Sequence, residues 1–107
     1  AELARHDELV APWLLWVELR NILLVSERRG RLPAGIAEQI VETIDGLGIR
    51  LDTTPSGPVV FDLCRRHGLT AYDGLYLEAA LRHGGPLVTL DRALRQAAAA
   101  EGVSVID

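Results

Sequence analysis

Three carboxylates, Glu18, Asp73 and Asp91, stand where an acidic side chain could do chemistry. Glu18 lies in a stretch of helical spacing whose other residues are mostly apolar, with Leu14 and Ile22 one turn away on either side. A carboxylate on such a face is costly unless it is paired or bound to a metal ion. Carboxylates that cluster repel one another, and their pKa values rise unless a cation neutralises them. Because oxygen ligands favour Mg²⁺ or Mn²⁺ over zinc, the three residues together predict a site for a hard divalent cation.

Each of these carboxylates also has a purely structural interpretation. Glu18 can sit at the rim of the apolar face and reach water. Asp73 follows Thr70 by three positions, the spacing of a capping box, and a first-turn carboxylate can still project toward a ligand. Asp91 follows an apolar run and can cap the next helix. Thr89 either offers its hydroxyl to a carboxylate or to metal-bound water, or simply favours a strand.

The elements that must position these residues alternate between helices and strands. Periodicity and capping residues predict helices over residues 13–29, 33–45, 56–67, 70–83 and 92–101, with Pro33 in a first turn. A short apolar run covers residues 9–11, and strands are predicted over residues 49–53, 87–90 and 103–106. This order indicates an α/β fold with a parallel sheet flanked by helices. Sites in such sheets lie beyond the carboxyl ends of the strands, which is where Asp91 falls.

The composition excludes several classes of protein. The 107 residues carry a formal net charge of −4, and all eleven basic residues are arginine. Mechanisms that need a lysine, such as the P-loop, are therefore excluded, and a general nucleic-acid coat protein would be basic. Cys64 is the one cysteine, which fits a cytoplasmic protein without disulfides, and no apolar run is long enough to span a membrane. The histidines show no metal-ligand spacing and are expected on the surface or at helix ends.

Longer stretches surround the three carboxylates in a fixed order. They are Trp16–Leu23 followed by Glu27–Gly30, then Arg66–Leu77, and then Pro86–Leu94. Together they resemble, in order and spacing and over essentially the whole chain, the acidic motifs of PIN-domain ribonucleases of the VapC toxin type. The resemblance implies a three-layer PIN-like domain and an endoribonuclease that depends on Mg²⁺ or Mn²⁺.

The same resemblance implies roles for individual residues. Glu18, Asp73 and Asp91 would be metal ligands, directly or through water, and Thr89 would support them. Arg92 is our candidate for holding the RNA backbone. The implied partners are an RNA substrate, a cognate antitoxin that inserts near the site, and a second copy of the chain in a homodimer.

An apolar group near the start of the first long helix is the candidate surface for these protein partners. It consists of Trp13, Leu14 and Trp16. The alternative is that these side chains belong to the ordinary core, which we favour for at least one of the tryptophans.

The chain departs from the family pattern at its beginning. That pattern has a first aspartate at the end of an N-terminal strand, whereas residues 1–8 here are expected to be the end of a helix and Asp7 is not assigned that role. We therefore expect a single PIN-like domain over residues 1–107 whose first strand is absent, leaving a sheet edge through which copies associate. A second hypothesis is a non-catalytic module that self-associates or binds an antitoxin. A receiver-type α/β domain is disfavoured because such domains use a lysine that this chain lacks.

Overall fold

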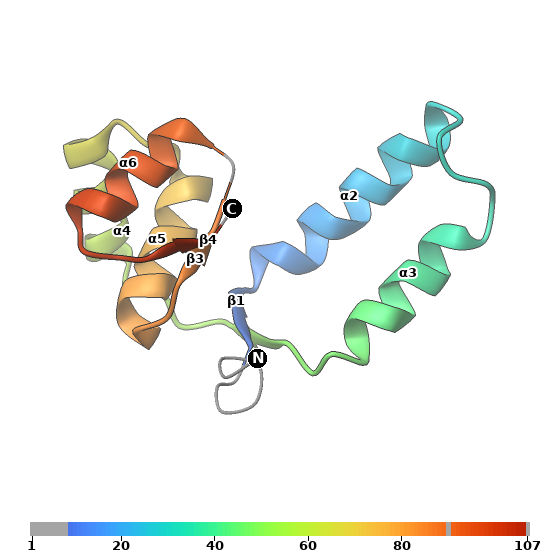
Figure 1. The fold of residues 1–107 in the computed structure, drawn as a ribbon, viewed down its shortest axis with the longest axis horizontal. Coiled ribbons are helices and arrows are strands. Elements are labelled where there is room, and N and C mark those ends of the chain that lie inside the picture. The colour runs from blue at the N-terminus through green and yellow to red at the C-terminus, as the bar shows by residue number, and fades with distance from the viewer. Residues whose placement is uncertain (1–8, 90, 107) are drawn as a thin grey trace. The chain divides into compact units, whose positions relative to one another are not determined.

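A computed structural model describes residues 9–89 and 91–106 of the chain. The chain divides into two compact units, Ala1–Leu51 and Asp52–Asp107 (Figure 1). The expectation of a single domain stays a prediction. The expectations for residues 1–8, namely the helix end, the absent strand and the role of Asp7, lie outside the described residues.

The first unit is built around two helices that contact one another. Strand β1 (Val10–Pro12) leads into α2 (Leu14–Arg28), and α3 (Ile36–Asp45) follows. Strand β2 (Arg50–Asp52) continues into the second unit and pairs with β1. The backbone amide of Arg50 donates to the carbonyl of Leu9 at 2.8 Å. Because α2 spans Leu14–Arg28, the helix predicted over residues 13–29 is confirmed to within one residue at each end.

The end of α2 shows how a local signal in the sequence stops a helix. Gly30 has a φ of 72°, its amide donates to the carbonyl of Glu27 at 2.9 Å, and the amide of Arg31 donates to the carbonyl of Ser26 at 2.8 Å. This pair of bonds is a Schellman motif, which satisfies carbonyls that the helix would otherwise leave unpaired. The prediction for Pro33 is wrong, because α3 begins only at Ile36, after a turn in which Gly35 takes a φ of 89°.

The second unit carries three helices around one pair of strands. Its elements are α4 (Gly57–His67), α5 (Ala71–His83), β3 (Leu87–Val88), α6 (Arg92–Ala100) and β4 (Val105–Ile106). Strand β3 pairs with β4 in parallel. The α/β class and the parallel pairing are therefore confirmed, and every predicted helix of this unit is present. Among the described residues the strands form two separate pairs rather than one continuous sheet.

The core of the second unit is formed by leucines and small residues from all three helices and from β3. Leu63 on α4 and Leu77 on α5 are completely buried. They pack in one cluster with Leu87, Leu94, Ala97, Ala98 and Val103. Alanines on α6 allow that short helix to approach α5 closely, because they add little side-chain bulk.

Helices α4 and α5 approach most closely at Gly74. A Cβ atom placed on Gly74 would overlap the Sγ atom of Cys64 and lie 3.4 Å from Cγ1 of Val60. The thiol of Cys64 is held in place, since its Sγ lies 3.2 Å from the carbonyl oxygen of Thr70. The glycine is therefore required by packing, even though its own helix would prefer another residue.

We expect Gly74→Ala to destabilise the protein by about 1–2 kcal/mol, because the cost of overpacking exceeds the gain in helix propensity. Chemical denaturation of Gly74→Ala, Cys64→Ala and the double variant measures this. The double variant should recover at least about 1 kcal/mol relative to the sum of the single changes. Strict additivity would show that the Cβ–Sγ overlap does not govern this contact.

Charged side chains form a buried ion cluster, which we define as Asp52, Glu78 and Arg82. Glu78 is 2% exposed and Asp52 is 8% exposed. The guanidinium of Arg82 donates through Nε to Oε2 of Glu78 at 2.7 Å, through a second nitrogen to Oε1 of Glu78 at 2.9 Å, and also to Oδ2 of Asp52. The amide of Ser56, at the start of α4, donates to Glu78 at 3.3 Å. One arginine thus ties the end of β2 and the start of α4 to α5.

The cluster changes the acidity of its members. Hydrogen bonding from Arg82 holds the pKa of Asp52 well below its usual range, against the opposing effect of burial, and the amide and hydroxyl of Thr54 add to the lowering. Hydrogen bonds to Glu78 and Asp52 raise the pKa of Arg82 above its usual value. Both shifts mean that the folded protein favours the charged forms.

Asp52 should therefore link stability to pH. Its folded pKa lies below its unfolded pKa, so its contribution is present above the unfolded pKa, near 4, and is lost as the pH falls toward the folded value. We expect Asp52→Asn to cost about 3 kcal/mol at pH 7 and progressively less between about pH 5 and pH 2. Urea unfolding across this range measures the effect. Asp62→Asn is the control, because Asp62 makes a surface ion pair with Arg66 on α4. An equal cost of Asp52→Asn at every pH would contradict the linkage.

A second, smaller set of charges joins the ends of α4 and α6. Oε2 of Glu101 lies 2.7 Å from Nε2 of His67 and also accepts a hydrogen bond from Arg66. The hydrogen bond with His67, aided by the charge of Arg66, lowers the pKa of Glu101. His67 and His83 each end a helix, as expected. No helix in the described part of the chain is long and apolar enough to cross a membrane.

Candidate metal and RNA-binding site

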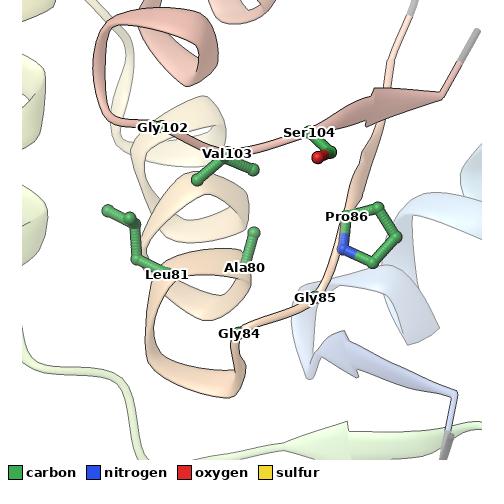
Figure 2. A pocket seen from close by; sticks show the side chains of 8 residues that line it. All are labelled: Ala80, Leu81, Gly84, Gly85, Pro86, Gly102, Val103 and Ser104. Atoms are coloured by element: carbon green, nitrogen blue, oxygen red, sulfur yellow. The ribbon is translucent and has the colours of Figure 1, made fainter.

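A hollow in the second unit lies away from the predicted site. It has a volume of about 400 Å³ and is lined by small and apolar residues together with glycine backbone: Ala80, Leu81, Gly84, Gly85, Pro86, Gly102, Val103 and Ser104 (Figure 2). Pro86 precedes β3 and Ser104 precedes β4, so the hollow sits at the amino ends of these parallel strands. Chemistry in such sheets lies at the opposite, carboxyl ends.

Asp91 follows the carboxyl end of β3 and is the N-cap of α6. Its Oδ2 accepts a hydrogen bond from the amide of Leu94 at 2.8 Å. Its own amide donates to Oγ1 of Thr89 at 3.0 Å. Thr89 therefore holds the backbone of Asp91 and not its carboxylate. The cap occupies one of the two carboxylate oxygens, and the residue is exposed, so the capping role and a ligand role are compatible.

Asp73 lies in the first turn of α5 and is half-buried. Its amide donates to Oγ1 of Thr70, the N-cap residue, at 3.3 Å, as the Thr-x-x-Asp spacing predicts. Gly74, the residue that follows Asp73, packs closely against α4. Asp73 is thus carried on a helix start whose position is set by packing on one side and by a cap on the other.

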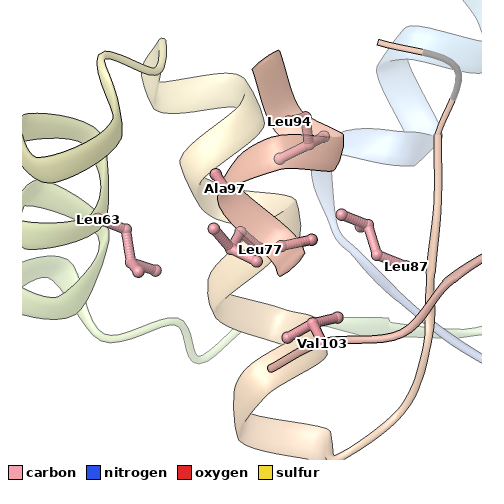
Figure 3. Close-up of a cluster of buried hydrophobic side chains, with 7 residues drawn as sticks. Leu63, Leu77, Leu87, Leu94, Ala97 and Val103 are labelled. Atoms are coloured by element: carbon pink, nitrogen blue, oxygen red, sulfur yellow. The ribbon is translucent and has the colours of Figure 1, made fainter. Parts of the chain in front are cut away.

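Asp73 and Asp91 lie at the same end of the second unit. Residues 84–86 are all that connects α5 to β3, and the two elements contact one another, so they run in opposite directions. Figure 3 shows Leu87 of β3 pointing toward Leu77 of α5, in agreement with their place in one core cluster, and α6 follows β3 in the chain. The first turn of α5, with Asp73, and the N-cap of α6, with Asp91, therefore point to the same end of the unit. Each helix start also presents partial positive charge that favours anions.

Glu18 belongs to the other unit, where it is half-buried in the middle of α2. Its position relative to Asp73 and Asp91 stays a prediction. Among residues 9–89 and 91–106, no group of three or more His, Cys, Asp and Glu side chains is close enough to hold a metal ion. The donors that the second unit offers are carboxylate oxygens from Asp73 and Asp91. That donor chemistry fits Mg²⁺ or Mn²⁺, which often use one or two carboxylates together with water and substrate phosphate.

The residues proposed for partners are accessible. Arg92 is exposed at the first position of α6, directly after Asp91. Trp13 and Trp16 are 45% and 51% exposed, and Leu14 is half-buried, so the core interpretation is wrong for both tryptophans. The guanidinium of Arg20 covers the ring of Trp16 at 3.6 Å from its centroid.

Sequence reasoning missed the buried ion cluster, although strongly perturbed pKa values often mark functional sites. The spacing of Glu78 and Arg82, four residues apart on one helix, signals that these two could pair. Nothing local signals Asp52, which is thirty residues from Arg82. Since the cluster involves the last turn of α5, the opposite end from Asp73, we assign it a structural role.

Comparison with known proteins assigns the chain to a family. The family model for the PIN domain matches residues 1–100. The chain belongs to the PIN-domain family. It is also 34% identical over 96 residues to Ribonuclease VapC3 of Pyrobaculum aerophilum, a match that covers 87% of this chain and 73% of that protein. The resemblance to VapC-type ribonucleases that the three acidic stretches indicate is thus confirmed, and the membership directs attention to the acidic end of the second unit.

The capping role of Asp91 can be separated from any chemical role by two substitutions. Asparagine caps a helix about as well as aspartate, whereas alanine cannot accept the bond from Leu94. We expect Asp91→Asn to change the free energy of unfolding little and Asp91→Ala to lower it by about 1 kcal/mol. Thermal and urea unfolding measure both. Equal stability of the two variants would show that the cap contributes nothing.

Proposed function

We propose that this PIN-domain chain is a VapC-type endoribonuclease toxin that hydrolyses RNA phosphodiester bonds with the aid of Mg²⁺ or Mn²⁺. The observation that carries the proposal is the presence of Asp73 and Asp91 at two helix starts at one end of a unit whose sequence matches the family. The relative is named a ribonuclease, and the donor chemistry of the two aspartates suits a hard cation.

Glu18, Asp73 and Asp91 would hold the metal ion. When bound, the ion would activate a water molecule for attack on phosphorus and neutralise charge on the scissile phosphate. Thr89 would act through the backbone, since its hydroxyl fixes the amide of Asp91 and thereby the direction of that carboxylate. Because this hydroxyl accepts from the amide, its own hydrogen remains available to donate.

The helix starts would help to bind the substrate. The backbone amides at the first turns of α5 and α6 attract phosphate groups, whereas the carboxylates of Asp73 and Asp91 repel them. A bound cation would neutralise the carboxylates, so the attraction would then prevail. Arg92 stands beside Asp91 and would donate to a phosphate oxygen of the RNA backbone. Cleavage by water in line with the leaving group would yield a 3′-hydroxyl and a 5′-phosphate.

We also propose that a cognate antitoxin neutralises the chain and that the chain forms a homodimer. The support is the exposure of Trp13 and Trp16 at the start of α2, because large aromatic side chains are enriched where proteins meet.

The test is a pair of substitutions that remove charge with little change in shape. We expect Asp73→Asn and Asp91→Asn each to lower Mn²⁺-dependent cleavage of a labelled RNA by about 100-fold or more, roughly 3 kcal/mol of transition-state stabilisation. Both should also lose the rise in melting temperature that Mn²⁺ gives the parent chain.

Asp62→Asn is the matched control, because this exposed aspartate lies on α4 and pairs with Arg66. It should cleave like the parent. Undiminished cleavage by Asp91→Asn would overturn the assignment of the site. A parent chain that is folded and binds no Mn²⁺ would favour the non-catalytic binding module instead.

A further inference from the structure

An aromatic side chain stands unused beside the proposed site. Tyr72 is 61% exposed and directly precedes Asp73 in the first turn of α5. Within the described residues its ring and hydroxyl have no hydrogen-bond or ring partner. Tyr76, one turn later on the same helix, instead packs against the core cluster. The core therefore does not account for a large ring at position 72.

The position of Tyr72 on the helix aims it at the acidic end of the unit. In an α-helix the Cα–Cβ bonds tilt toward the N-terminus, so side chains of the first turn project past the helix start. Tyr72 and Asp73 both belong to this turn, and the hydrogen bonds of the Thr70 cap fix its backbone. Tyr72 thus directly precedes a proposed metal ligand in the chain, on a helix rather than a loop.

We infer that the Tyr72 ring stacks on one base of the RNA beside the scissile phosphate, which makes Tyr72 a substrate-binding residue of this site. This inference rests on the proposed function and deepens it. Exposed aromatic rings bind unstacked bases of single-stranded RNA, whereas bases within a duplex are already stacked on their neighbours. The phenol hydroxyl has no part in the contact, so only the ring is required.

The chemistry of the chain supports a contact of this kind. The formal net charge is −4, so the protein as a whole repels a polyanion. Arg66 and Arg82 are held in ion pairs within the second unit and are not available to phosphate groups. Stacking adds affinity without requiring positive charge. It also tolerates any base, so Tyr72 would add affinity and not a sequence preference.

The experiment measures binding and cleavage separately, using the full chain. Binding of a fluorescein-labelled 12-nucleotide single-stranded RNA is followed by anisotropy with Ca²⁺ in place of Mn²⁺, and cleavage of the same RNA is followed with Mn²⁺. We expect Tyr72→Ala to weaken binding by about 5- to 100-fold and to raise KM with little change in kcat. Tyr72→Phe should behave like the parent chain.

Phe61→Ala is the matched control, because Phe61 is 62% exposed on α4 and carries its own cation–π contact with Arg65. It should leave binding and cleavage unchanged. Equal binding by Tyr72→Ala and the parent would overturn the inference while leaving the nuclease proposal intact. The inference would also be overturned if Tyr72→Ala bound RNA like the parent but lost self-association on light scattering, because the ring would then belong to a contact between copies. A parent chain that binds RNA through Tyr72 and cleaves nothing would refute only the proposed function.

Discussion

The guanidinium of Arg82, held between two buried carboxylates, is the constraint on which the second unit depends. Glu78 and Asp52 are almost completely buried. The free energy needed to remove their charges from water exceeds the stabilisation that an exposed ion pair gives. The cost is offset by good geometry, because Arg82 binds Glu78 through two nitrogens and Asp52 through a third bond. What the cluster chiefly provides is position. It joins the end of β2, the start of α4 and the last turns of α5, and this helps to hold α5 against α4. Gly74 then meets Cys64, and the start of α5 presents Asp73.

Features that the sequence predicts well are those whose partners lie within a few residues. Ser56, Thr70 and Asp91 all cap helices as expected, because each accepts from an amide three residues ahead. Features decided by distant partners were not predictable. Asp52 and Arg82 are thirty residues apart, and no periodicity announces that they meet. The predicted start of α3 was wrong for a local reason. Proline suits a first turn, but Gly35 takes a left-handed conformation, and the helix begins only after it.

The candidate site shows the same division. The sequence offers two roles for Asp91, a helix cap and a metal ligand. The structure makes these roles compatible, since the cap uses Oδ2 and leaves the second oxygen for other contacts. Asp73 is similar, because its amide donates to the hydroxyl of Thr70 while its side chain lies in the first turn of α5. The order of elements alone placed these two aspartates at one end, through the short connection from α5 to β3. Glu18 is different: its role depends on how α2 meets the second unit, which is a matter of packing between distant elements and has no local signal.

The proposed binding of RNA by a chain with excess negative charge must rest on local contacts. Of its arginines, Arg82 and Arg66 neutralise internal carboxylates and Arg20 lies over a tryptophan ring, so the general attraction that basic proteins use is weak here. The helix starts at Asp73 and Asp91 attract phosphate only once a cation offsets their own charge. Metal and substrate should therefore bind cooperatively, each supplying what the other lacks. Discrimination among RNAs must then come from the shape and strandedness of the segment that enters the acidic end, and not from charge.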